Sequence, residues 1–374
     1  MTVILYLSIL LTSLYVLLIG CYFYGWLRIH YFDLKDAATE TYQTFSILIP
    51  ARNEAHVIVK CLEDIMRQDY AQNLFEVIVI NDHSTDETQL IVEQFCKRYP
   101  EFNVQIIHMH DDSEQRKLKK AAITFGIKKA TKNYIILTDA DCERGTEWLS
   151  TLNHFISKKH CKMVYAPVAF KAENIFQKIQ AMEFAGLVGI GASAIRLKNP
   201  NMCSAANLMF EKKVFDEVEG YKGYDGIASG DDEFLMHKVF KLYPNEVMFL
   251  KNEKAVVYTS ANTSLHELAD QRRRWVSKST KYENRYITAI LVGAYFFNAS
   301  IIFNLLFNVE VGMYQLLAKT FIEGIFLFSV LHFFKMKRFL FFLPIAELFH
   351  ILYVVIIGIW ANYGTYNWKG RNVK

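Results

Sequence analysis

The sequence predicts an α/β domain with a mainly parallel sheet, flanked at both ends of the chain by helices that are long enough to cross a membrane. Three observations lead to this fold class. Short apolar runs alternate with amphipathic stretches between about residues 45 and 138, which is the pattern of βαβ units. Long apolar segments lie near both ends. Hydrophobic residues make up 52% of the 374 residues, more than an ordinary soluble domain carries.

The first apolar segment, Val3–Trp26, contains no charged side chain and predicts a membrane anchor over residues 1–27. We expect an uncleaved anchor, because no basic stretch precedes it and no A-x-A-like site follows. Lipoprotein processing at Cys21 is disfavoured, since the apolar run continues past that residue. The first charges after the run, Arg28 and Lys35, are basic and predict that the next domain lies in the cytoplasm. The expected location is therefore the inner (cytoplasmic) membrane, with several spans.

Four short apolar runs predict strands, at Phe45–Pro50, Phe75–Ile80, Val104–His108 and Tyr134–Thr138. Amphipathic stretches between them predict helices at His56–Arg67, Thr88–Tyr99 and Leu118–Ala130. Polar residues follow three of the strands, in Arg52-Asn53-Glu54, Asn81-Asp82-His83 and Asp139-Ala140-Asp141. Open α/β sheets bind their ligands at this carboxyl edge, so these side chains predict a ligand cleft.

The last of these polar groups predicts a metal site. If the backbone stays extended past Thr138, Asp139 and Asp141 project from the same side of the chain. Two carboxylates at a strand end suit Mg²⁺ or Mn²⁺ bound together with a substrate phosphate. A surface turn with two solvated acids is the alternative interpretation.

Two later stretches carry further candidate residues. Gly230-Asp231-Asp232-Glu233 places three acids before an apolar run, which is also the composition of an acidic first helical turn. Leu265–Ser277 predicts a basic amphipathic helix that contains Gln271-Arg272-Arg273-Arg274-Trp275. That helix is also typical of a membrane interface, with arginines at lipid phosphates and the tryptophan at headgroup level.

Three apolar segments near the C-terminus, Tyr286–Asn308, Val311–Phe334 and Phe339–Ala361, are each long enough to span a membrane. Lys319 and Glu323 lie four residues apart and are expected to pair inside the bundle. The number of spans stays at two to three, because three would place the basic tail at Arg371 outside.

Charge and cysteine content limit the expected partners. The net charge of +4 does not suggest nucleic acid. Basic residues cluster instead at Arg116–Lys120, Lys128–Lys132 and Arg272–Arg274, where phosphates or anionic lipid headgroups are the expected partners. The six cysteines form no C-x-x-C pair and are expected to be free thiols of a reducing compartment.

Five motifs in this order resemble the membrane-bound inverting family 2 glycosyltransferases. The motifs are Ile47-Leu48-Ile49-Pro50-Ala51-Arg52-Asn53-Glu54, Val79-Ile80-Asn81-Asp82, Asp139-x-Asp141, Gly230-Asp231-Asp232 and Gln271-x-x-Arg274-Trp275. The resemblance implies a GT-A-type, Rossmann-like domain over residues 28–285, followed by a membrane region over 286–374. It also implies a hexosyltransferase that uses a UDP-sugar with Mg²⁺ or Mn²⁺.

The resemblance also implies roles for single residues. Pro50, Ala51 and Glu54 would line the nucleobase pocket, and Asp82 would hold the uracil–ribose part. Lys119 would approach the diphosphate, although a solvated helix lysine is the alternative. Asp139 would bind donor and metal, and Asp141 the metal more directly. Asp232 would be the general base, with Asp231 able to exchange roles, and the acceptor side would be formed by Gln271, Arg274 and Trp275.

The expected reaction is transfer of one sugar to a lipid acceptor at the cytoplasmic face. The small C-terminal membrane region and the absence of a gating-loop motif after Trp275 favour single transfer. A processive polysaccharide synthase, with a growing glycan as acceptor, is the alternative within the same family. A sugar nucleotidyltransferase is disfavoured because no Gly-rich loop follows the first strand, and a non-catalytic scaffold because no motif acid is missing. The oligomeric state is not predicted.

Overall fold

A computed structural model describes residues 2–34, 41–109, 119–227, 229–278, 281–282, 284–360, 366–368 and 371–373. The chain forms two compact units. The first, the sheet unit, contains Ile29–Phe170 and Ala194–Ser260. The second, the helical unit, contains Met1–Arg28, Lys171–Ser193 and Ala261–Lys374. The expected domain of residues 28–285 is thus shared between the units, because residues 171–193 and 261–285 group with the apolar helices.

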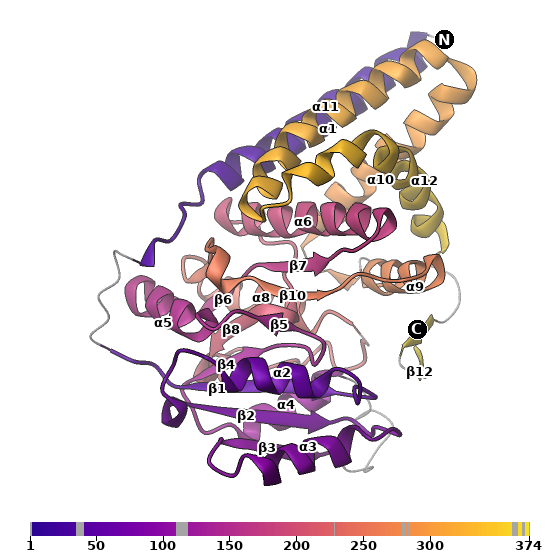
Figure 1. Cartoon of the computed structure of the whole chain (residues 1–374). Helices are drawn as coiled ribbons and strands as arrows, with labels where there is room; N and C mark the ends of the chain where they lie inside the picture. The colour runs from indigo at the N-terminus through magenta and orange to yellow at the C-terminus, as the bar shows by residue number, and fades with distance from the viewer. Residues whose placement is uncertain are drawn as a thin grey trace. The chain divides into compact units, whose positions relative to one another are not determined.

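A seven-stranded sheet forms the centre of the sheet unit (Figure 1), in the order β3-β2-β1-β4-β8-β6-β9. Its strands are β1 Phe45–Ala51, β2 Phe75–Asn81, β3 Val104–His108, β4 Tyr134–Leu137, β6 Met163–Tyr165, β8 Leu208–Glu211 and β9 Val247–Phe249. The pairs β1–β2, β1–β4 and β2–β3 are parallel, and β8 is antiparallel to both of its neighbours. The mainly parallel sheet and all four predicted strands are confirmed. Thr138 was wrongly included, since β4 ends at Leu137.

Helices pack along this sheet, and a small second sheet adjoins it. The helices are α2 Ile58–Met66, α3 Thr88–Arg98, α4 Lys119–Lys129, α5 Trp148–Lys159, α7 Lys212–Glu217 and α8 Asp231–Leu242. The second sheet has the order β5-β10-β7, with β5 Glu143–Arg144, β7 Val168–Lys171 and β10 Val257–Ser260. The three predicted helices are present, although Leu118 lies outside the described residues. All six cysteines are free thiols, as expected.

The strand order marks the expected ligand position beside β1. β2 and β3 follow on one side of β1, whereas β4 lies on the other, so the direction of winding reverses between β1 and β4. The loops after β1 and β4 therefore leave the sheet in opposite directions. In open α/β sheets, ligands usually bind between two such loops. These two loops begin with Arg52 and Thr138, next to the predicted motifs.

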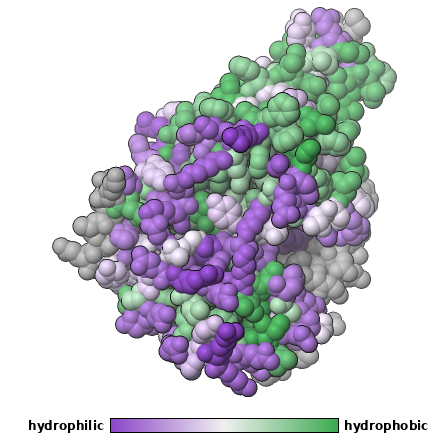
Figure 2. All heavy atoms as spheres, viewed as in Figure 1, coloured by the Kyte–Doolittle hydropathy of each residue, from purple (hydrophilic) through white to green (hydrophobic). Residues whose placement is uncertain are grey.

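Among the described residues of the helical unit, four helices are long and apolar enough to span a membrane. They cover Thr2–Leu27 (α1), Arg285–Phe307 (α10), Val309–Phe333 (α11) and Lys337–Trp360, which combines the short helix η7 (Lys337–Phe342) with α12 (Leu343–Trp360). The same unit contains α6 Ile175–Arg196, α9 Leu265–Val276, β11 Tyr366–Trp368 and β12 Arg371–Val373. Figure 2 shows that apolar residues cover the long helices. The predicted apolar helices are present, and Ala361 lies outside the described residues.

A charged cluster lies inside this bundle of helices. Lys319 of α11 is fully buried and pairs with Glu323, at 2.6 Å, as its sequence spacing predicted. Glu347 of α12 forms a second ion pair with the same ammonium, and Tyr15 of α1 donates a hydrogen bond to Glu323. The cluster therefore joins α1, α11 and α12. The sequence pattern did not identify Glu347.

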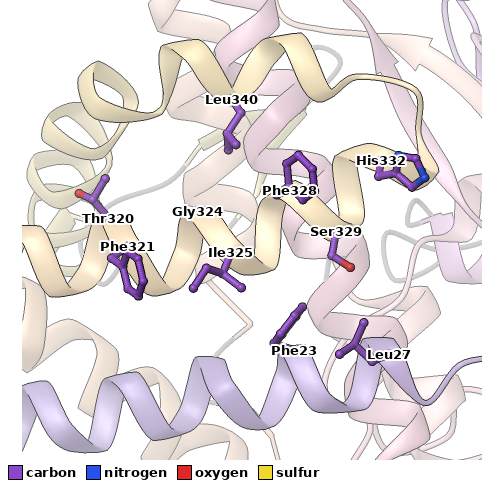
Figure 3. A pocket seen from close by; sticks show the side chains of 10 residues that line it. All are labelled: Phe23, Leu27, Thr320, Phe321, Gly324, Ile325, Phe328, Ser329, His332 and Leu340. Atoms are coloured by element: carbon purple, nitrogen blue, oxygen red, sulfur yellow. The ribbon is translucent and has the colours of Figure 1, made fainter.

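An apolar groove of about 570 Å³ lies between α1, α11 and η7 (Figure 3). Phe23 and Leu27 form one wall, Phe321 and Ile325 line the opposite one, and Phe328 lies on the side of Leu340. The groove contains none of the predicted site residues.

Candidate active site

Lys119 joins two of the predicted carboxylate motifs in the sheet unit. Its ammonium lies 2.7 Å from Asp139, in the turn after β4, and 3.6 Å from Asp231, the first residue of α8. Burial alone would lower the pKa of Lys119, but these two carboxylates raise it above its ordinary value. The alternative of a solvated lysine is therefore wrong. Lys119 and the two acids form one charged centre at the carboxyl edge of the sheet.

Lys120, the next residue, holds the loop that leads into Asp231. It is buried and donates to the carbonyl oxygens of Ile227, at 2.5 Å, and Ser229, at 2.7 Å. Gly230 then caps α8 with φ of +80°, a left-handed conformation that glycine adopts without steric cost. Lys119 thus contacts the two carboxylates, and Lys120 contacts the loop that presents Asp231. Arg116 to Leu118, the other members of the predicted basic cluster, lie outside the described residues.

Asp141 has different surroundings from Asp139. The chain turns after β4, so the expected extended backbone through these two residues is wrong. The Asp141 carboxylate accepts a 2.7 Å hydrogen bond from Thr259 of β10. Among the described residues, no three His, Cys, Asp or Glu side chains converge as a metal site. Two partly exposed carboxylates still fit Mg²⁺ or Mn²⁺, since such ions complete their shell with water and substrate phosphate.

Asp232 is held at the start of α8 by backbone donors. One of its oxygens accepts from the Ala205 amide at 3.1 Å, and the other from the Glu233 amide at 2.8 Å. Asp231 is more deeply buried, and its Oδ2 has no hydrogen-bond partner in the described structure beyond the ion pair with Lys119. The two adjacent acids therefore differ in environment, which separates their possible roles. Both lie in the first turn of α8, so the alternative expectation, an acidic first helical turn, is confirmed as well.

Two loops are tied together beside the charged centre. The Asp82 amide donates to the Ala51 carbonyl at 2.9 Å, and Arg52 donates to the carbonyls of Asp82 and His83. The Glu54 amide donates to the Thr88 hydroxyl at 2.8 Å. These bonds fix the loops that follow β1 and β2 as one wall.

The predicted nucleobase residues belong to this wall. Ala51, Glu54 and Asp82 are buried, whereas Pro50 is half-buried at the end of β1. The Asp82 carboxylate lies 3.0 Å from the ring nitrogen Nδ1 of His83. The structure thus places these four residues in neighbouring loops and strand ends.

The remaining predicted residues, Gln271, Arg274 and Trp275, lie on α9 in the helical unit. The Gln271 side-chain oxygen accepts from Asn262 at 3.0 Å. Trp275 packs near Phe184 of α6, with ring centroids 6.0 Å apart. Within the described part of the chain, the half-buried Arg274 guanidinium has no ion-pair or hydrogen-bond partner.

Lys120 was expected at phosphates or lipid headgroups as part of the basic cluster, but it is buried and holds a loop instead. The sequence analysis missed Thr259, described above, and Arg144. Its buried guanidinium donates to the Cys142 carbonyl at 2.8 Å and stacks on Trp148 at 4.8 Å. Arg144 therefore braces the turn that carries Asp139 and Asp141. No pattern in the sequence signalled Thr259 or Arg144.

The fold and the site define a class of protein: an α/β domain with carboxylates and a lysine at the carboxyl edge of the sheet, where the direction of winding reverses. Residues 46–219 match the family model described as glycosyl transferase family 2. The chain therefore carries a glycosyltransferase family 2 domain, as its motifs predicted, and the domain has the GT-A fold.

Two curated relatives are similar over about half of the chain. The dolichyl N-acetyl-alpha-D-glucosaminyl phosphate 3-beta-D-2,3-diacetamido-2,3-dideoxy-beta-D-glucuronosyltransferase of Methanococcus voltae is 28% identical over 209 residues, which cover 54% of this chain and 64% of the relative. Glycosyltransferase AglE of Haloferax volcanii is 31% identical over 194 residues, 52% of this chain and 60% of the relative. The chain thus spans less than two thirds of the length of either relative.

A solved structure supports the fold. The mannosyltransferase PcManGT from Pyrobaculum calidifontis, in complex with GDP-Man and Mn²⁺, aligns with a TM-score of 0.60 and 16% identity. The alignment covers 96% of this chain and 100% of that protein.

Proposed function

We propose that the protein is an inverting glycosyltransferase that moves a sugar from a UDP-sugar to a hydroxyl of a membrane-associated lipid acceptor. The single observation that carries this proposal is the position of Lys119 between Asp139 and Asp231. A cation between two acids at a sheet crevice suits a diphosphate on one side and a proton acceptor on the other.

The proposed donor site uses the wall formed by the loops after β1 and β2. Asp82 binds the uracil–ribose part, and Pro50, Ala51 and Glu54 line the base. Lys119 contacts the diphosphate, with Asp139 orienting its ammonium at 2.7 Å. A fixed ammonium stabilises negative charge as it develops on the leaving UDP.

The proposed acceptor chemistry belongs to Asp232. The backbone N–H groups of Ala205 and Glu233 each bond to one of its oxygens and fix the orientation of the carboxylate. Asp232 takes the hydroxyl proton as the acceptor oxygen bonds to the anomeric carbon and the bond to the β-phosphate oxygen breaks. One displacement inverts the anomeric centre, so no carboxylate nucleophile is required. Gln271, Trp275 and Arg274, whose guanidinium suits phosphate oxygens, are assigned to the acceptor side by the family resemblance.

Asp141 and Asp139 are the proposed ligands of Mg²⁺ or Mn²⁺. A divalent ion bound there supplies positive charge to the leaving diphosphate. Thr259 orients the Asp141 carboxylate, and Arg144 holds the turn behind it.

The proposed setting is the inner (cytoplasmic) membrane, with the sheet unit in the cytoplasm. Candidate spans and the basic residues Arg28, Lys335, Lys337 and Arg338 next to their ends support this topology. Lipid acceptors agree with the name of the Methanococcus voltae relative, which contains a dolichyl phosphate. A processive polysaccharide synthase remains the second candidate, because it would share the same motifs.

The experiment is a nucleotide-release assay on the full chain in lipid. A panel of UDP-sugars, with GDP-mannose as a rival donor, is tested with Mn²⁺, Mg²⁺ or EDTA. The extracted lipids are then analysed by mass spectrometry. Metal-dependent UDP release with a lipid heavier by one sugar is the expected result.

Each other outcome revises a separate part of the proposal. A growing polymer would identify a processive synthase. Release from GDP-mannose alone would replace the UDP-sugar, and undiminished release in EDTA would remove the metal. The absence of release from every donor, in lipid that contains polyprenyl phosphates, would refute transfer.

A further inference from the structure

The three consecutive arginines of α9 have different surroundings. Arg272 and Arg273 are 4% and 9% exposed, whereas Arg274 is half-buried. Arg272 stacks over Trp275 of its own helix, and Arg273 over Trp360 of α12, both at 4.3 Å. The expected position of all three arginines at lipid phosphates is therefore wrong for the first two. Their side chains pack inside the helical unit.

Arg272 connects α9 to two other helices. Its guanidinium forms a 2.8 Å ion pair with Glu183 of α6, and the same carboxylate accepts a hydrogen bond from Tyr353 of α12. Burial alone would raise the pKa of Glu183, but Arg272 lowers it below its ordinary value. The carboxylate therefore stays ionised at neutral pH. Removing one partner of such a buried pair leaves an uncompensated charge.

The same guanidinium also fixes a motif residue. Arg272 donates to the Gln271 side-chain oxygen at 2.7 Å, and Asn262 donates to that oxygen at 3.0 Å. Asn262 is held in turn by Gln180 of α6, through bonds of 3.0 and 3.1 Å. Gln271 and Trp275 thus both contact groups that α6 positions.

α6 is itself held close to the bundle. A Cβ at Gly189 would lie 2.7 Å from Val330 of α11, so only glycine permits this approach of the two helices. Gly189 lies less than two turns after Glu183 on the same helix. Glu183 therefore projects from a helix that is fixed against the transmembrane bundle.

We propose that Glu183 and Tyr353 are positioning residues, which set the orientation of α9 and of its motif side chains through the buried guanidinium of Arg272. This inference rests on the proposed function, because that proposal assigns Gln271, Arg274 and Trp275 to the acceptor side. Arg272 anchors the helix, which leaves Arg274 as the arginine that contacts substrate.

The test compares variants of the full chain in lipid. Glu183→Gln removes the charge at nearly constant volume, and Tyr353→Phe removes one hydrogen bond. Glu173→Gln is the matched control, because Glu173 is an exposed acid just before α6. The measurements are kcat, KM for the acceptor, the dissociation constant of UDP, and amide hydrogen exchange of α9.

We expect Glu183→Gln to lower kcat by about 10- to 100-fold, the range for a displacement of catalytic groups by about 1 Å. UDP affinity should stay within about twofold, since the proposed UDP ligands belong to the sheet unit, and α9 amides should exchange faster. Tyr353→Phe should change the same quantities in the same direction by less. A double variant Glu183→Gln/Arg272→Gln should be no less active than Arg272→Gln alone, since the pair acts as a unit.

Two results would overturn the inference. One is a kcat of Glu183→Gln equal to that of Glu173→Gln with unchanged exchange in α9. The other is a parallel loss of kcat, UDP affinity and thermal stability, which would indicate general unfolding. Failure of the proposed function is distinguishable, because the wild-type chain would then release no nucleotide while α9 exchange still reports on the anchor.

Discussion

Replacing Lys119 with methionine tests the charged centre directly. At an effective dielectric constant of about 20, attraction across 2.7 and 3.6 Å amounts to about 6 and 5 kcal/mol before desolvation. Desolvation of the three groups offsets most of this, and the Asp139 side chain is 39% exposed. We therefore expect a net loss of about 1–3 kcal/mol. For a domain of this size, that loss lowers Tm by about 2–10 °C.

The assay is thermal unfolding of the full chain, combined with titration of UDP. Lys128→Met is the matched control, since Lys128 is an exposed lysine on the same helix. Lys119→Met should lower Tm and weaken UDP binding, whereas the control should change neither. If both variants behave like the wild type, the charged centre contributes neither to stability nor to UDP binding.

The raised pKa of Lys119 fixes the sign of the pH dependence. A raised pKa in the folded state means that the stabilisation is fully present below the unfolded value, about 10.4, and is lost above it. The difference in Tm between Lys119→Met and the wild type should therefore stay constant from pH 6 to about pH 9. A difference that shrinks over this range would contradict the assignment.

Three further substitutions test separate parts of the site. Asp232→Asn should lower turnover by about 10²- to 10⁴-fold and leave UDP binding largely intact, as measured by nucleotide release and calorimetry; near-normal turnover would transfer the role of base to Asp231. Asp141→Ala should weaken donor and Mn²⁺ binding together in calorimetric titrations, and an unchanged Mn²⁺ affinity would exclude it as a ligand. Gly230→Ala should lower the free energy of unfolding by about 1–2 kcal/mol, because φ is +80° there, and chemical denaturation would reveal a smaller cost if the loop relaxes.

Much of the sheet unit was predictable because its signals are local. The strands are short apolar runs, and their polar residues follow at the carboxyl ends, so the sequence alone places Asp82 and Asp139 at the same edge. The turn after Leu137 was not predictable in the same way. It is held by Arg144 and Thr259, which are contacts that no periodic pattern reports.

The arginines of α9 show that the burial of a side chain was not predictable from the local sequence either. Three adjacent residues of one type look equivalent in sequence, yet Arg272 is buried because Glu183 and Tyr353 meet it from distant parts of the chain. Lys119 is a similar case, since its pairing with Asp231 depends on how the loop before α8 folds back. Burial of a charge is decided by its partners, and those partners lie far away in sequence.

The charged cluster of Lys319, Glu323 and Glu347 bears on how the chain is made. A lysine or acid at the centre of a single inserting helix costs about 2.5–3.5 kcal/mol, so α11 alone is a poor substrate for the insertion machinery. Glu323 pairs with Lys319 within α11, whereas Glu347, the second partner, is synthesised only later, on α12. In the proposed membrane setting, α11 and α12 should therefore enter the bilayer together as a hairpin. The cluster would then act during biogenesis, before any substrate is met.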